Sequence, residues 1–179
     1  MNLPWAVGEY LVVPFRPFVG NKDKNELILS SCERHPERFT LPMTRQDIRV
    51  TAAWYLTDPS NLVWEVWRGT SFVGIILLDR IVPNVDARWH FVFFDGNLIG
   101  KQAVLLEFVR RAFTLPLERL SLEIPENVAS LISFARRKLG FTYEGGDRKG
   151  ARREHSHFDG TRWHDTMLLR LLKSEFACP

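Results

Sequence analysis

The chain has 179 residues, a mass of 20.8 kDa and a formal net charge of +3; 45% of its residues are hydrophobic and 25% are charged. This balance is typical of a globular protein and excludes disordered and collagen-like chains. The apolar runs are far shorter than the roughly 20 residues that span a bilayer, and two cysteines, Cys32 and Cys178, cannot build a disulfide framework. The opening residues lack the pattern of an export signal, so we expect one cytoplasmic domain over residues 1–179.

Apolar periodicity and turn residues predict the elements of the first half. Ile48, Ala52 and Tyr55 fall on one face of a helix. The segment 68–70, with its central glycine, separates two β-rich runs and predicts a hairpin. In chain order we expect a strand over 9–15, a helix over 23–33, a helix around 48–55, and strands over 62–67, 71–78 and 86–94.

The second half continues with alternating helices and strands. Leu105, Phe108 and Ala112 form the apolar stripe of a helix, and Gly140 stands where a helix commonly ends. The expected elements are a helix over 101–113, a strand over 120–124, a helix after 125–127, and strands over 141–143 and 161–172. This order predicts an α/β (α+β) layered fold, with a mixed sheet of about seven strands and helices on both faces.

The loop between strand 86–94 and the next helix is the most informative segment. Gly96 and Gly100 let the backbone approach a ligand closely, and the helix start offers N–H groups to an anion. The loop is neither a Walker sequence nor a GxGxxG sequence. Many strand-to-helix turns contain glycine, so this loop alone indicates only an anion site.

Together with the order of elements, this loop resembles the GNAT N-acetyltransferase superfamily over nearly the whole chain. That family carries Q/R-x-x-G-x-G/A here, and residues 97–102 occupy the motif, with Asn97 at the Gln or Arg position and Gln102 at the final Gly or Ala position. The string KLGFTYEG over 138–145 is similar to the branch that acetylates ribosomal-protein N-termini. Further matches to that branch are residues 112–113 and 120–127, Gly74, Arg148, Gly160 and Asp165.

The resemblance implies a GNAT-like, mostly antiparallel sheet and acetyl-CoA as co-substrate. The amides of residues 99–103 would bind its pyrophosphate, and Lys101 and the basic segment 148–153 would meet its phosphates. Asn127 is displaced by two residues from the position of the family's asparagine. The expected cofactor-binding residues are Phe93, Ile99, Gly100, Lys101, Gln102, Ala103 and Asn127.

Acetyl transfer to an amine needs a proton acceptor, because the amine attacks only when uncharged. His90 lies on the strand where the family often keeps its base, and histidine titrates near neutrality; the alternative is that it packs among Trp89, Phe91 and Phe93. Glu65 is a second candidate base. Asp86 and Asp95 are the other carboxylates of the strand 86–94 and its end; both also fit turn or strand-end positions.

The group that protonates the leaving thiolate is a separate question. The tyrosine of many GNAT enzymes would fall at Arg136, so the resemblance implies a serine instead, either Ser130 or Ser133. An ordinary helix serine is the alternative for both. The expected catalytic residues are therefore His90, Ser130 and Glu65.

Charge is uneven along the chain. Residues 1–90 carry ten basic and ten acidic residues, whereas 91–179 carry fourteen and eleven. The basic segment 148–153 fits either a polyanion, which would be a phosphorylated cofactor or nucleic acid, or a solvated hairpin. His155, His157 and His164 have no metal-ligand spacing with cysteines, and we expect no metal site.

The sequence therefore predicts an acyl-CoA-dependent N-acetyltransferase that acts on a primary amine of a protein N-terminus, a small molecule or a nucleobase. The acetyl donor would be acetyl-CoA, nucleic acid is a further candidate partner, and the protein would be a monomer or homodimer without a membrane partner. Trp54 and Tyr55 either line the acceptor side or belong to the core. The substitution at Gln102 and the absent tyrosine favour one alternative, a non-catalytic GNAT-like binding or interaction module.

Overall fold

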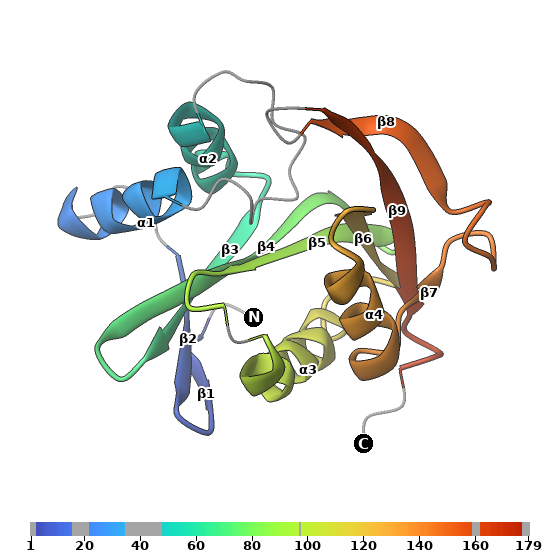
Figure 1. The fold of residues 1–179 in the computed structure, drawn as a ribbon. Helices are drawn as coiled ribbons and strands as arrows, with labels where there is room; N and C mark the ends of the chain where they lie inside the picture. Colours follow the sequence, from blue (N-terminus) through green and yellow to red (C-terminus); the bar gives the residue numbers. More distant parts are fainter. Residues whose placement is uncertain (1–2, 16–21, 35–47, 97, 159–161, 177–179) are drawn as a thin grey trace.

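The computed structural model describes residues 3–15, 22–34, 48–96, 98–158 and 162–176, and within them nine strands form one sheet (Figure 1). The strands run in the order β1-β2-β3-β4-β5-β6-β9-β7, and β8 also pairs with β9. Among these strands only β5 and β6 are parallel neighbours. The expected mixed, mostly antiparallel sheet is confirmed. The strands are β1 (Trp5–Val7), β2 (Tyr10–Pro14), β3 (Leu62–Arg68), β4 (Ser71–Val82), β5 (Asp86–Phe93), β6 (Arg119–Pro125), β7 (Thr142–Tyr143), β8 (Arg152–Phe158) and β9 (Trp163–Leu172).

The sheet has more strands than the seven or so that the sequence predicts. The short strand β1 contains only three residues, too few for an alternating pattern. The strand β8 covers RREHSHF, which is charged and polar almost throughout. Its structure depends on pairing with β9, with an irregularity between Arg153 and His157, so a pattern of apolar residues could not reveal it.

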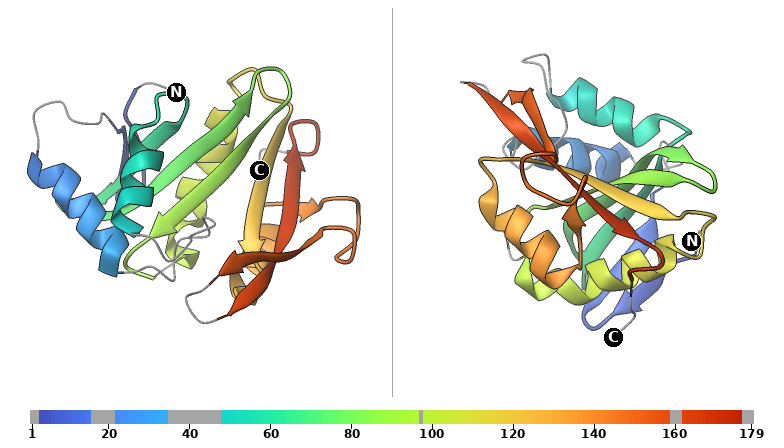
Figure 2. Two further views of the ribbon diagram at one scale, coloured as in Figure 1. Left: turned by 90° about the horizontal axis from the view of Figure 1, so that it is seen from above. Right: turned by 90° about the vertical axis from the view of Figure 1, so that its right-hand side faces the viewer.

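Helices cover both faces of the sheet, as expected. In the right-hand view of Figure 2, α1 and α2 lie above the sheet and α3 and α4 lie below it. Each pair of helices encloses its own group of buried apolar side chains against the strands. None of the described helices combines the length and apolar character needed to cross a membrane. The helices are α1 (Lys22–Arg34), α2 (Ile48–Thr57), α3 (Gln102–Ala112) with the short 3-10 helix η2 (Ile99–Lys101) before it, and α4 (Ala129–Lys138).

Aromatic packing joins α3 to the centre of the sheet. The ring of Phe108 stacks on Trp89 with centroids 5.4 Å apart and meets the edge of Trp64 at 5.0 Å. All three side chains are almost fully buried. Aromatic pairs of this kind contribute about 0.5–1.5 kcal/mol each beyond the burial of their area. This packing fixes α3, and with it the loop after β5, against the strands.

The parallel pair β5 and β6 separates after a short contact. Its register contains three pairs, from Asp86 with Arg119 to Arg88 with Ser121. Both strands continue beyond these residues, β5 to Phe93 and β6 to Pro125. The left-hand view of Figure 2 shows the two strands diverging. The backbone of β5 beyond Arg88 therefore has no ladder partner on the β6 side.

Gly74 should be essential to the pairing of β4 with β5. A Cβ atom at this position would lie 2.3 Å from the carbonyl oxygen of Val92 and 2.6 Å from the Phe93 ring. We expect Gly74→Ala to lower the free energy of unfolding by about 1–3 kcal/mol, the usual cost of overpacking a core. Urea unfolding measures this change. Gly150→Ala is the control, because its Cβ would meet nothing closer than 3.4 Å; equal losses in both variants would contradict the steric explanation.

Candidate functional site

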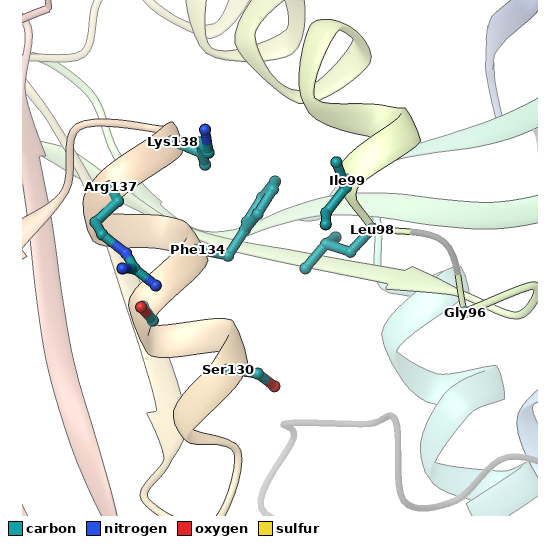
Figure 3. Close-up of a pocket in the computed structure, with 8 residues that line it drawn as sticks. Gly96, Leu98, Ile99, Ser130, Phe134, Arg137 and Lys138 are labelled. Carbon is teal, nitrogen blue, oxygen red and sulfur yellow. The ribbon is translucent and has the colours of Figure 1, made fainter.

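A cavity of about 540 Å³ lies between η2 and α4, on the face of the sheet that α3 and α4 cover. In Figure 3, Phe134 points from α4 toward Leu98 and Ile99. The α4 residues that line the cavity recur at helical spacing, so one face of this helix forms its wall. The lining residues are Gly96, Leu98, Ile99, Ser130, Ser133, Phe134, Arg137 and Lys138.

The loop after β5 folds into a tight turn before α3. Gly96 has a φ of 73°, which favours glycine. The amide of Lys101 donates to the Leu98 carbonyl at 3.1 Å, and the amide of Gln102 donates to that of Ile99. These two amides are thus used inside the turn, although we expected both in an anion cradle. The cations that line the cavity come instead from α4.

Arg137 and Lys138 place positive charge on the α4 wall. The side chain of Gln102 donates to the Lys138 carbonyl at 3.4 Å and connects the start of α3 to the end of α4. Leu98, Ile99 and Phe134 supply an apolar surface next to these cations. This combination of charge and apolar surface suits a ligand that has both phosphates and an apolar chain.

Lys101 does not face the cavity, and the expectation that its side chain meets phosphates is wrong. The side chain is fully buried, and its Nζ lies 2.5 Å from Asp95 Oδ1. The same Nζ lies 5.1 Å from the ring centroid of Phe93 and 5.8 Å from that of Tyr10. Burying a cation is costly unless it is paired, so the contact with Asp95 explains its position. The ion pair between Lys101 and Asp95 therefore connects the two ends of the loop on its buried side.

Several other expected cofactor residues also lie away from this cavity. Phe93 is buried in the core cluster that contacts α3. Asn127 is exposed, and its amide nitrogen lies 3.4 Å from His164 Nε2. Arg136, at the position of the family's tyrosine, places its guanidinium 4.1 Å from the Tyr143 ring centroid. Gly100 and Ala103 belong to η2 and α3, and Asn97 lies outside the described residues.

His90 lies on the opposite face of the sheet from this cavity. Neighbouring side chains of a strand alternate between faces, so the alternative that His90 packs among Trp89, Phe91 and Phe93 is wrong about its neighbours, although His90 is buried. His90 Nε2 lies 3.1 Å from Asp79 Oδ1. The same carboxylate accepts a forked pair from Arg88, with distances of 2.8 and 2.5 Å. All three side chains are buried.

The charges of this cluster follow from burial and hydrogen bonding. Burial lowers the pKa of His90, and the contact with Asp79 opposes that shift without reversing it. Burial would raise the pKa of Asp79, but hydrogen bonds from Arg88 and His90 outweigh it and hold that pKa well below its usual range. A neutral His90 beside an ionised Asp79 donates from Nε2. Nδ1 then carries the lone pair, and it has no hydrogen-bond partner among the described residues.

The three expected carboxylates are all held by other groups. Glu65 is fully buried on β3 and accepts a hydrogen bond from Trp67 Nε1 at 2.8 Å; β4 lies between β3 and β5. Asp86 pairs with Arg119 at 2.6 Å, and Asp95 pairs with Lys101 as described above.

In contrast to these carboxylates, the two candidate serines, Ser130 and Ser133, both line the cavity between η2 and α4. The structure therefore places the candidate acids and the candidate base on opposite faces of the sheet.

A second cavity, of about 440 Å³, lies on the face that carries His90. We call it the arginine groove. Arg88 lines it and lies two residues before His90 on β5, so both point to the same face. Asp79 and Arg88 were not among the expected site residues; the antiparallel pairing of β4 with β5 places them directly opposite each other. The charged residues of the arginine groove are Arg80, Arg88, Arg119, Arg153, Asp86, Glu123 and Glu144.

The basic segment 148–153 forms ion pairs with acidic neighbours. Arg148 contacts Glu126 at 2.5 Å, Arg152 contacts Asp165, and Arg153 contacts Glu123 at 3.4 Å. Paired arginines offer less charge to a polyanion, so the solvated hairpin describes this segment better. The described residues contain no group of three or more His, Cys, Asp or Glu side chains that could hold a metal ion.

Trp54 and Tyr55 differ in burial. Trp54 is 58% exposed on α2, whereas Tyr55 packs partly against the core between α1, α2 and the sheet. Their rings meet edge to face, with centroids 4.8 Å apart. Tyr55 therefore belongs mainly to the core, and Trp54 is the ring that reaches the surface.

Comparison of the sequence with protein-family models and with curated proteins gives no match. Solved structures do resemble the chain. A probable GNAT-family acetyltransferase from Chromobacterium violaceum has a TM-score of 0.74 at 16% identity, covering 98% of this chain and 93% of that one. Mycobacterium smegmatis RimJ in complex with CoA-disulfide has a TM-score of 0.69 at 17% identity, covering 94% and 84%. Vibrio cholerae spermidine N-acetyltransferase in complex with CoA and spermine has a TM-score of 0.71 at 12% identity, covering 93% and 97%.

These likenesses show that the chain has the GNAT acetyltransferase fold. The similar structures include both RimJ and a spermidine acetyltransferase. They therefore do not single out the ribosomal-protein branch. At identities of 12–17%, they show only that the fold is shared.

Proposed function

We propose that this chain is an acyl-CoA-dependent N-acetyltransferase that transfers an acetyl group from acetyl-CoA to a primary amine. One observation carries the proposal: β5 and β6 diverge between a cavity with cations on one face and a buried Asp79–His90 pair on the other. Such a divergence lets two reactants meet from opposite faces. The CoA complexes of two similar structures support the assignment of the donor. We also propose that residues 1–179 form one acetyltransferase domain in the cytoplasm.

The residues of the first cavity fit the donor. Arg137 and Lys138 would bind its phosphates, because arginine and lysine are common phosphate ligands. Leu98, Ile99 and Phe134 would contact its apolar arm. When bound, acetyl-CoA would supply the acetyl group as a thioester. The protein's contribution is then to align the two reactants, to accept a proton from the amine and to supply one to the leaving thiolate.

On the acceptor face, His90 would take the proton. Asp79 holds Nε2, so Nδ1 carries the lone pair; because Nδ1 is buried, the proton of the amine would reach it through a bridging water. Backbone N–H groups of β5 beyond Arg88, where β6 is no longer paired, can stabilise the carbonyl oxygen. Ser130 or Ser133 could protonate the thiolate. A thiol has a pKa of about 8.5, so loss of this serine should matter less than loss of the base.

Donor binding can be tested by thermal unfolding. A ligand at a hundredfold excess over its Kd stabilises the native state by about 2.7 kcal/mol, and each kcal/mol raises the Tm of a chain of this size by about 2–4 °C. We expect acetyl-CoA to raise the Tm accordingly. Arg137→Glu should weaken binding about tenfold or more, because it replaces a charged donor with a repelling carboxylate.

Arg136→Glu is the matched control for Arg137→Glu. It changes the same charge on the same turn of α4, but its side chain lies over Tyr143 and outside the cavity. A folded protein with no shift at millimolar acetyl-CoA would contradict the donor. A normal shift with no release of free thiol in the presence of any amine would instead favour the non-catalytic module.

A further inference from the structure

The arginine groove shares a carboxylate with the proposed base. Arg88 lines the groove and binds Asp79 through two hydrogen bonds, and Asp79 also contacts His90. The groove extends over β6 to Glu123 and Arg153. It lies on the face opposite the cavity between η2 and α4, which is the face that carries His90; His90 itself is buried behind Arg88 and Asp79 and does not line the groove.

Three of the four arginines that line the groove are committed to carboxylates. Arg88 contacts Asp79 and also lies 3.3 Å from the carboxylate of Glu123. Arg153 lies 3.4 Å from the same carboxylate. Arg119 binds Asp86 at 2.6 Å and Glu144 at 3.4 Å. These three arginines and four carboxylates leave one negative charge in excess.

Arg80 supplies the remaining positive charge. It lines the groove, is exposed, and has no ion-pair or hydrogen-bond partner among the described side chains. With Arg80 included, the network has four positive and four negative charges. A ligand that matches such a site carries both signs of charge and no net charge.

The backbone at Arg80 is held in an unusual conformation. Its φ is 47°, in the left-handed region that non-glycine residues rarely adopt. Arg80 lies in an irregularity of the β4–β5 pairing, between Asp79 and Val82. Bulges of this kind redirect a side chain, and retained backbone strain is common at functional sites. Here the bulge brings an uncommitted guanidinium to the groove.

We propose that the arginine groove binds the amine acceptor, and that this acceptor is a zwitterion whose carboxylate is held by Arg80. This inference rests on the proposed acetyl transfer. The acceptor arrives with its amine protonated, close to Glu123, and one proton passes to the buried His90 through a bridging water. The uncharged amine then attacks the thioester carbon, the C–S bond breaks as the C–N bond forms, and the second nitrogen proton goes to the leaving thiolate. Its carboxylate forms a forked contact with Arg80. A polyamine fits this groove poorly, because it would bring additional positive charge next to Arg80.

The test compares matched acceptors in a thiol-release assay with acetyl-CoA. One arm uses ω-amino acids of increasing chain length and their ω-amino amides. The other uses short peptides whose second residue is glutamate or glutamine, which separates a small acceptor from a protein N-terminus. We expect kcat/KM to be about tenfold to a hundredfold higher for the carboxylate member of the preferred pair, the usual effect of one charge-assisted contact. Spermine should be a poor acceptor.

Arg80→Gln should remove this preference, because kcat/KM should fall for the carboxylate acceptor and not for its amide. Arg68→Gln, which alters an exposed arginine at the end of β3, is the matched control and should change neither value. Arg80→Gly should also remove the preference, yet its Tm should not fall, because glycine accepts this φ without strain. Loss of selectivity with retained stability distinguishes recognition from a folding defect.

Three results would overturn the proposal: equal or better use of the amides, spermine as the best acceptor, or an equal effect of Arg80→Gln on both members of a pair. Calorimetric titration with the same ω-amino acids and amides needs no turnover. If no amine releases thiol, the proposed transfer fails, whereas carboxylate-dependent binding that Arg80→Gln weakens still supports the groove. Absence of any difference in binding between acid and amide overturns the groove itself.

Discussion

Replacing His90 with glutamine should lower the kcat of acetyl transfer by about a hundredfold or more, the usual contribution of a positioned proton acceptor. Glutamine can still donate a hydrogen bond to Asp79, so the buried carboxylate keeps a partner. It has no basic nitrogen, however, and cannot take the proton of the amine. Donor binding should survive, because His90 lies on the face opposite Arg137 and Lys138. Thiol release measures kcat, and the thermal shift with acetyl-CoA measures donor binding.

The pH dependence gives a second readout for His90. Burial lowers the pKa of His90, so activity should fall on the acidic side only below the ordinary histidine value of about 6.5. His90→Gln should lack this limb. The free energy of unfolding should also fall at acidic pH. The unfolded chain binds a proton at His90 more readily than the folded chain does, so stability decreases as the pH drops below about 6.5. His90→Gln should remove that contribution.

His155→Gln is the control, since it removes an exposed histidine from β8. A decrease of less than about threefold in His90→Gln, with the acidic limb retained, would contradict the assignment, given the effect that a base normally has. Loss of folding together with donor binding would show that His90 mainly supports the sheet.

Removing the Asp79 carboxylate should have the largest effect on stability. Asp79 and Arg88 are each only 5% exposed. In Asp79→Ala the Arg88 guanidinium stays buried, with only the longer contact to Glu123 at 3.3 Å. Breaking a buried ion pair in this way costs about 3–5 kcal/mol. We therefore expect this decrease in the free energy of unfolding, measured with urea at neutral pH.

The pair Asp86–Arg119 provides a control on the same sheet. Its side chains are 22% and 34% exposed, and exposed pairs contribute only about 0–1 kcal/mol. Asp86→Ala should therefore change stability little. A similar loss in both variants would contradict the importance of burial. Because the pKa of Asp79 is depressed, its contribution should be complete above its unfolded pKa of about 3.9 and should disappear as the pH falls further.

A double variant can separate stability from catalysis. Replacing a buried ion pair with apolar side chains of similar size is often neutral or stabilising. Asp79→Leu combined with Arg88→Met should recover much of the stability that Asp79→Ala loses. It should remain poor in kcat, because His90 Nε2 has lost the carboxylate that orients it. Recovery of both properties would show that Asp79 does not position His90.

The sequence predicts the order of most elements because their apolar patterns are local. Leu105, Phe108 and Ala112 recur at helical spacing, and all three are buried in α3. Leu120, Leu122 and Ile124 alternate along β6 and face the core. The strand β8 could not be predicted in this way, because most of its residues are polar and it forms by pairing with β9.

The directions of the side chains at the site could not be predicted as well as the order of the elements. His90 is flanked by aromatic residues in the chain, but alternation along β5 turns it to the other face. Lys101 lies next to the glycine loop in the chain, yet Asp95 and the rings of Tyr10 and Phe93 draw its side chain inward. Both differences arise from neighbours that are adjacent only after folding.

The amino-acid sequence by itself therefore determined the layered fold, the glycine-containing loop before α3 and the strand that carries the candidate base. Each of these depends on periodicity or on residues close together in the chain. The tertiary structure decided which charges pair. Asp79 meets Arg88 through the pairing of β4 with β5, and Glu123 reaches them only because β6 lies beside β5. Burial then sets the strength of these contacts, because a charge away from water must find a partner, and the pairing of strands determines which partner is within reach.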